Sequence, residues 1–178
     1  GCHTVALQAP EGLKRFLPRL AHDLRHLGYE VIISGDPCYG ACDLDLRARD
    51  RADVLVHIGH TPVDDTKQVI YELWPVEGDL TVISDVIPRL NGRRVGLVTT
   101  IQHIHLLPQV VELVRSAGIE PVIAEPSSRT PCPGQVLGCS FDAARKTGTD
   151  EIIFLGTGLF IQLASNLLPG HGYLPVIL

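Results

Sequence analysis

The sequence predicts an α/β protein made of duplicated parallel-sheet domains with flanking helices. Short β-branched runs alternate with longer helical stretches along the whole chain, and this order restarts near residue 94. Of the 178 residues, 45% are hydrophobic and 20% are charged. Strands that alternate with helices are typical of a parallel sheet covered on both faces. A chain of this length and composition buries a core without needing disulfides.

The first domain is predicted over residues 1–92. Its strands are residues 3–8, 29–34, 53–58 and 68–73, and its helices are residues 11–27, 43–51 and 80–90. The helix over 11–27 follows from apolar residues at three- and four-residue spacing, and Gly28 ends it. Asn91 and Gly92 end the last helix, so we expect the domain boundary there.

The second domain is predicted over residues 93–178. Its strands are residues 94–99, 120–124, 151–155 and 174–178, and its helices are residues 106–117, 141–147 and 159–167. A proline-rich loop over 125–138 separates the second strand from the next helix. The strand and helix order therefore resembles that of the first domain.

An internal duplication is indicated when residues 41–60 are placed on residues 138–157, at a constant separation of 97 residues. The identical pairs are Cys42 and Cys139, Asp45 and Asp142, Asp53 and Asp150, and Gly59 and Gly156. They include a cysteine before a helix and a glycine after the following strand. We interpret the pattern as two repeats with one cysteine each.

The cysteines point to metal chemistry. There are five of them, and the chain opens with no secretory signal, which favours reduced thiols or metal ligands over disulfides. Cys42 and Cys139 lie in strand-to-helix loops, at the sheet edge where α/β proteins bind ligands and where a helix dipole favours a thiolate. Two thiolates do not complete a zinc or iron–sulphur site, so we expect a third repeat to supply the remainder. Cys38 is expected to have a packing role and Cys132 to be a loop thiol.

Weaker candidates for substrate contact also follow predicted strands. They are His60, Gln102, Gly156 and Gly158. Each has a plainer interpretation, as a hydrogen-bonded loop side chain or as a turn glycine. Asp45 and Asp142 are expected to cap or brace the cysteine loops rather than to act in catalysis.

Charge and hydropathy exclude several function classes. The net charge is −5, and the 15 lysine and arginine residues form no run, which argues against direct nucleic-acid or membrane-surface binding. No apolar run approaches the roughly 20 residues of a membrane span. We therefore expect a cytoplasmic protein with no membrane association.

Two segments carry a family resemblance. GDPCYGACDLD at residues 35–45 and DVLVHIGH at residues 53–60 resemble the signature of the diphthamide synthase family, also called 2-(3-amino-3-carboxypropyl)histidine synthase. Further matches are LQAPEG at 7–12, LVTTIQ at 97–102, QVLGC at 135–139 and FLGTGLF at 154–160. They follow the family's order through nearly the whole chain.

The resemblance implies a pseudo-threefold architecture of three α/β repeats, each giving one cysteine to a single 4Fe–4S cluster. The matching positions are Cys42 and Cys139, and the third ligand would lie in a third repeat that this chain lacks. Residues 161–172 depart from the family pattern, as an insertion or as a discontinuity.

The implied activity is a transferase reaction, the first step of diphthamide biosynthesis. A radical mechanism would move the 3-amino-3-carboxypropyl group from S-adenosylmethionine to C2 of a histidine of elongation factor 2. The resemblance also implies a homodimer and an electron donor that the sequence does not identify. The usual CxxxCxxC motif of radical S-adenosylmethionine enzymes is absent, as expected for ligands drawn from separate repeats.

Two alternatives stay open. A lyase of the quinolinate synthase type also builds a 4Fe–4S site from three repeats, but it uses the open iron as a Lewis acid and needs no S-adenosylmethionine. A non-catalytic partner subunit of the same family would support the cluster of a sister protein and would not modify elongation factor 2 alone.

Overall fold

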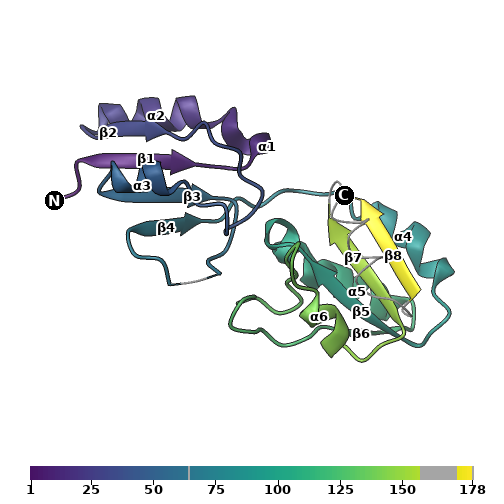
Figure 1. The fold of residues 1–178 in the computed structure, drawn as a ribbon. Coiled ribbons are helices and arrows are strands. Elements are labelled where there is room, and N and C mark those ends of the chain that lie inside the picture. Colours follow the sequence, from purple (N-terminus) through teal and green to yellow (C-terminus); the bar gives the residue numbers. More distant parts are fainter. Residues whose placement is uncertain (64, 157–171, 178) are drawn as a thin grey trace. The chain divides into compact units, whose positions relative to one another are not determined.

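The computed structural model describes residues 1–63, 65–156 and 172–177 and divides the chain into two compact units, Gly1–Trp74 and Pro75–Leu178 (Figure 1). Each unit contains a four-stranded sheet in which every strand pair is parallel. The predicted α/β class is therefore confirmed. The predicted helix over 159–167 and the site residue Gly158 lie outside the described residues.

The first unit has the strand order β2-β1-β3-β4. Its strands are β1 (Thr4–Gln8), β2 (Glu30–Ile33), β3 (Val54–Ile58) and β4 (Val69–Glu72), and its helices are α1 (Glu11–Lys14), α2 (Leu17–His26) and α3 (Leu46–Asp50). Alternation along β1 sends Val5 and Leu7 into one core with Leu17 of α2, and Ala6 into another with Ala48 of α3. Helices thus cover both faces of the sheet.

The single helix predicted over 11–27 is instead two helices. α1 ends at Lys14, and α2 begins at Leu17 with Pro18 in its first turn. A proline is tolerated there because its missing N–H would have no helical partner, but the same residue inside a continuous helix would break a hydrogen bond. The apolar spacing carried no sign of this interruption.

The second unit repeats the topology with the order β6-β5-β7-β8. Its strands are β5 (Arg94–Thr99), β6 (Glu120–Val122), β7 (Glu151–Gly156) and β8 (Gly172–Ile177), and its helical segments are α4 (Thr81–Val86), η1 (Ile87–Arg89), η2 (Ile101–Leu106), α5 (Leu107–Ser116) and α6 (Asp142–Lys146). The matching strand order supports the duplication inferred from the sequence.

The division between the units falls after Trp74, earlier than the boundary near Asn91 that the sequence suggested. The reason is the packing of α4, which the sequence placed in the first domain. Its buried residues Ile83 and Val86 belong to the same core as Val95 and Val110. An apolar helix face shows that a helix packs on a sheet but does not show which sheet.

In each unit a carboxylate at the start of one central strand binds the backbone at or just before the start of the other central strand. Oδ2 of Asp53 accepts hydrogen bonds from the amides of His3 (2.7 Å) and Thr4 (2.9 Å). In the second unit Glu151 accepts from the amides of Asn91 (3.0 Å) and Gly92 (2.6 Å). The amides of Thr4 and His3 hold the pKa of Asp53 below its usual value. Both units therefore use a carboxylate in this way. In the second unit it is Glu151, one residue after Asp150, which the overlay pairs with Asp53.

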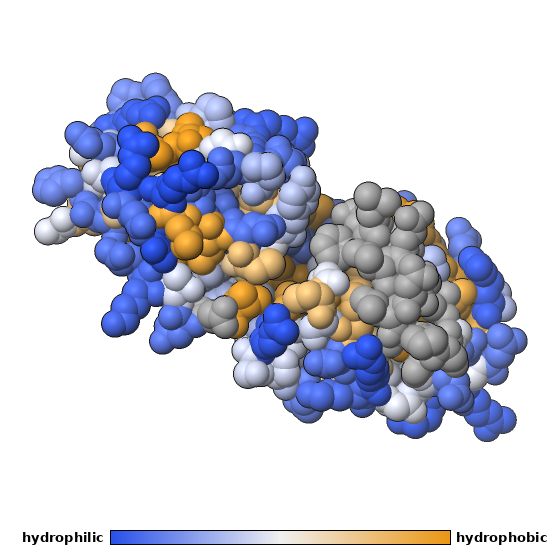
Figure 2. All heavy atoms as spheres, in the orientation of Figure 1, coloured by the Kyte–Doolittle hydropathy of each residue, from blue (hydrophilic) through white to orange (hydrophobic). Residues whose placement is uncertain are grey.

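Hydrophilic residues cover most of the face drawn in Figure 2, and hydrophobic side chains gather in only a few places on it. In the first unit Phe16 and Trp74 stack with ring centroids 5.2 Å apart. Among the residues that the structure describes, no helix combines the length and the apolar character that crossing a membrane requires.

Substitution of Gly96 tests the packing of the second sheet. A Cβ at this position in β5 would lie 2.8 Å from the hydroxyls of Thr147 and Thr149, so Gly96→Ala should lower the free energy of unfolding by about 1–3 kcal/mol. Gly12→Ala is the matched control, because a Cβ at Gly12 in α1 meets nothing within 4 Å. Urea unfolding of both variants measures the difference. Equal stability of the Gly96→Ala and wild-type proteins would contradict this packing.

Candidate functional site

The two cysteines singled out by the repeat overlay occupy the same kind of turn. The amide of Asp43 donates to the carbonyl of Gly40 (3.0 Å), and the amide of Ser140 donates to the carbonyl of Leu137 (3.0 Å). Both bonds close a four-residue turn whose third residue is the cysteine, and the two turns are 97 residues apart. Cys42 and Cys139 are both exposed free thiols. The structure therefore gives the two cysteines equivalent local geometry, each within its own unit.

Asp45 braces the turn of the first unit. It precedes α3, where Oδ1 accepts from the amide of Ala48 (2.9 Å), and Oδ2 accepts from the hydroxyl of Ser34 (2.7 Å). Burial acts to raise the pKa of Asp45, but these hydrogen bonds outweigh it, so the pKa lies below its usual value. The expectation that Asp45 caps a helix beside Cys42 is confirmed.

The turn of the second unit is braced differently. Asp142 lies inside α6 and accepts from the hydroxyl of Ser140 (3.2 Å) and from Arg145 (3.1 Å). The guanidinium of Arg129 donates to Sγ of Cys139 over 3.6 Å. Asp142 thus supports the cysteine loop as expected, without capping the helix as Asp45 does.

Gln8, the last residue of β1, connects the first sheet to the cysteine loop. Its side chain is fully buried. Nε2 donates to the carbonyl of Asp43 (2.6 Å), and Oε1 accepts from the amide of Asp45 (3.1 Å). Oε1 also lies 3.1 Å from Nδ1 of His57, its neighbour across the β1–β3 pair. The sequence analysis did not single out Gln8.

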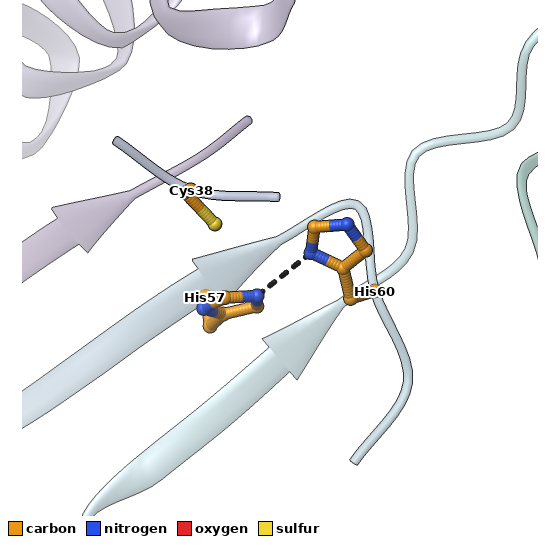
Figure 3. A group of neighbouring side chains, drawn as sticks. All are labelled: Cys38, His57 and His60. Carbon is orange, nitrogen blue, oxygen red and sulfur yellow. Dashed lines mark hydrogen bonds between the residues drawn. The ribbon is translucent and has the colours of Figure 1, made fainter. Parts of the chain in front are cut away.

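Three side chains of the first unit, among them the His57 that Gln8 contacts, lie close together (Figure 3). Cys38, His57 and His60 bring a sulphur and two nitrogens within 4.8 Å of one another. Nε2 of His57 lies 2.9 Å from Nδ1 of His60, and the Cys38 thiol points toward the two rings. Cys38 and His57 are buried, and His60 is half-buried.

Burial keeps this group uncharged. It raises the pKa of the Cys38 thiol to about 11, and it lowers the pKa of His57 to about 4, with a smaller contribution from His60. Burial also lowers the pKa of His60. The sequence analysis expected a packing role for Cys38 and did not single out His57. The available signal was the spacing of His57 and His60 at the end of a strand that follows a cysteine loop.

The remaining predicted residues lie after strand ends. Gln102 is in η2, directly after β5, and its carbonyl accepts from the amide of Val76 (2.9 Å). Gly156 is the last residue of β7. Cys132 is half-buried in the loop before Cys139, where its amide donates to Oε1 of Gln135 (3.2 Å).

Fold and site together define a class of protein. It is a duplicated α/β protein that presents one exposed cysteine turn at the carboxyl edge of each parallel sheet. Residues 9–171 match the profile of a family described as "Putative diphthamide synthesis protein". The chain belongs to this family.

Relatives and solved structures agree with this assignment. The chain is 35% identical over 170 residues to the 2-(3-amino-3-carboxypropyl)histidine synthase of Pyrococcus horikoshii, covering 92% of this chain and 49% of that protein. It is 33% identical to subunit 1 of the Gallus gallus synthase, over 98% of this chain and 45% of that protein. The chain spans about half the length of these relatives.

The fold is also that of a solved homologue. The structure of Dph2 from Pyrococcus horikoshii with a 4Fe-4S cluster superposes with a TM-score of 0.86 at 32% identity, over 99% of this chain and 54% of that chain. A second structure of Dph2 from the same organism matches with the same TM-score, identity and coverage. The resemblance stated from the sequence motifs is therefore confirmed at the level of the family and the fold.

Asp45 provides a test of the brace. Asp45→Ala removes the helix cap beside Cys42 and should lower the free energy of unfolding by about 1 kcal/mol, whereas Asp45→Asn keeps a capping oxygen and should lose less. Because the folded-state pKa of Asp45 is depressed, the stability it adds is present above its unfolded pKa and is lost as the pH falls through the folded value.

The difference between wild type and Asp45→Asn should therefore stay constant above about pH 5 and shrink as the pH falls below about 4, the usual pKa of an aspartate. Urea unfolding across this range measures it. A difference that grows in acid, or an Asp45→Ala protein with full stability, would show that the carboxylate does not brace this loop.

Proposed function

We propose that this chain forms part of an iron–sulphur transferase that moves the 3-amino-3-carboxypropyl group of S-adenosylmethionine to C2 of a histidine of elongation factor 2. The observation that carries the proposal is the pair of matching cysteine turns, one in each repeat, in a chain 35% identical to a 2-(3-amino-3-carboxypropyl)histidine synthase. The solved homologue whose description includes a 4Fe-4S cluster supports the cofactor.

The cysteines fit such a cluster. Iron–sulphur clusters bind cysteine thiolates, and Cys42 and Cys139 are exposed free thiols that an external group can reach. We assign both as ligands and place the third cysteine outside this chain. When bound, a cluster with an open iron supplies single electrons at a potential that the surrounding protein tunes.

The residues of this chain hold the ligands in place. The turn bonds fix the backbone of Cys42 and Cys139, and Gln8 attaches the first turn to the end of β1. Arg129 donates to Sγ of Cys139 and so orients that side chain. A ligand held by several neighbours keeps its geometry when substrate binds.

Substrate contacts are part of the same proposal. His60 and Gln102 follow β3 and β5, and Gly156 is the last residue of β7, at the sheet edges where ligands of α/β proteins bind. A glycine at the end of a strand lets a ligand approach the backbone closely, which is the role we propose for Gly156 and Gly158. The proposal also includes a homodimer, a separate electron donor and a cytoplasmic location, where elongation factor 2 is found.

Cluster reconstitution tests the ligand assignment. The full-length protein, reconstituted with iron and sulphide without oxygen, should bind about four iron atoms per chain. Cys42→Ala and Cys139→Ala should each lose most of this iron and its visible absorbance, while Cys132→Ala, the matched loop control, should keep both. Full iron retention in Cys42→Ala or Cys139→Ala would overturn the assignment.

The transfer itself is tested with S-adenosylmethionine, dithionite as reductant, and elongation factor 2. The expected product is elongation factor 2 with one 3-amino-3-carboxypropyl group on a histidine, detected by mass spectrometry. Gln102→Ala should keep its iron but raise the KM for S-adenosylmethionine by about tenfold, as for a lost polar contact. A protein that forms the cluster but does not bind S-adenosylmethionine would favour the lyase alternative. A protein that binds it without transfer would favour the partner subunit.

A further inference from the structure

We infer that Cys38, His57 and His60 form a mononuclear zinc site in the first unit, distinct from the thiols of Cys42 and Cys139. One thiolate and two imidazole nitrogens are a ligand set that Zn²⁺ favours. The three ligand atoms already lie within 4.8 Å of one another, and they come from the cysteine loop, the end of β3 and the residues after it (Figure 3).

Only small movements separate this arrangement from tetrahedral coordination. With Zn–N near 2.1 Å and Zn–S near 2.3 Å, two nitrogens and one sulphur in tetrahedral positions lie about 3.4–3.6 Å apart. Nε2 of His57 and Nδ1 of His60 are 2.9 Å apart and would separate slightly. Sγ of Cys38, within 4.8 Å of both, would move by about 1 Å, which a cysteine side-chain rotation supplies.

Gln8 selects the tautomer of His57 that binds metal. Its Nε2 donates to the carbonyl of Asp43, and its Oε1 accepts from the amide of Asp45, so the orientation of the carboxamide is fixed. The atom facing Nδ1 of His57 is thus an acceptor, and Nδ1 must carry the proton. The lone pair of His57 is then on Nε2, facing His60. Zinc-binding histidines are usually held in this way by an acceptor on the other nitrogen.

Zinc would displace one proton, that of the Cys38 thiol, which is released to solvent, while the ring proton of His60 would move from Nδ1 to Nε2 and leave that imidazole neutral. The thiolate leaves one net positive charge on the metal. The carboxylate of Asp43 is close enough to influence the ionisation of all three side chains, and its Oδ2 accepts from the amide of Tyr39. The negative charge of Asp43 would therefore offset part of that positive charge, and the fourth position would be open to water or a substrate. With Nδ1 on zinc, Nε2 of His60 stays available to a substrate.

The fold does not require these polar groups. In the second unit Phe154 takes the position of His57, and it pairs with Val98 where His57 pairs with Gln8. Phe154 is fully buried in an apolar core. The equivalent strand pair thus carries two hydrocarbon side chains in the second unit and a glutamine and a histidine in the first, and a ligand-binding role accounts for this difference.

Cobalt binding tests the inference, because a thiolate–Co²⁺ site has a ligand-to-metal charge-transfer band and intense visible bands when tetrahedral. The full-length, iron-free protein is titrated with Co²⁺ without oxygen, and Co²⁺ is then displaced by Zn²⁺. His22→Gln and His26→Gln are present in every protein, since that exposed pair, 3.0 Å apart, offers a second histidine site. We expect about one Co²⁺ per chain.

Variants separate this site from the cluster ligands. Cys38→Ser should abolish the charge-transfer band, and His60→Gln should weaken binding by 10–100-fold. The charge-transfer band should persist in Cys42→Ser, Cys139→Ser and Cys132→Ser. Because Cys42→Ser is expected to bind no cluster, its band would show that the zinc site forms independently of the cluster. A failed zinc site and a failed cluster therefore give different results. Zn²⁺ should raise the Tm of Cys42→Ser but not of Cys38→Ser.

Among the three proposed ligands only His60 is half-buried, so His60→Gln is the ligand variant expected to disturb folding least. Circular dichroism of this variant checks that it folds. Absence of tetrahedral Co²⁺ in the parent protein would overturn the inference. A charge-transfer band that survives Cys38→Ser, or that disappears in Cys42→Ser, would also overturn it, because the cluster thiols would then be the ligands.

Discussion

The carboxamide of Gln8 is the interaction on which the first half of the site depends. It is buried at the end of β1, and its two polar atoms reach Asp43, Asp45 and His57. Without it, a carbonyl, an amide and an imidazole N–H would be left unpaired in the interior, each at a cost of about 1–3 kcal/mol. The cysteine loop, the cap of α3 and the histidine pair therefore share one support.

The second unit reaches the same cysteine turn by another route. Its loop is held by backbone pairing, in which the amide of Thr99 donates to Gly134 (3.0 Å) and the amide of Val136 donates to Thr99 (2.8 Å). Within the loop, Oε1 of the buried Gln135 accepts from the amide of Cys132 (3.2 Å), and Val98 stands where Gln8 stands in the first unit. Strand order and the cysteine turn are common to both units, whereas the means of attachment differ, so the turn is the local feature that the two repeats share at the proposed site.

Much of the fold and the equivalence of the Cys42 and Cys139 turns were predictable, because β-branched runs mark strands and a fixed separation aligns the two cysteines. The packing of α4 on the second sheet was not, since its apolar face fits either sheet. The His57 site was missed for a different reason. Gln8 and His57 are 49 residues apart, and only the register of β1 on β3 brings them together.

Burial assigns different chemistry to two cysteines four residues apart. Cys42 is exposed, so it can bind a group that arrives from outside the first unit. Cys38 is 1% exposed, and burial raises its thiol pKa to about 11, so it stays protonated unless a cation lies inside with it. A metal held by Cys38, His57 and His60 would fix one end of the loop and leave the Cys42 turn free to present its thiol. In our proposals, the loop therefore supplies both an internal metal ligand, Cys38, and an external one, Cys42.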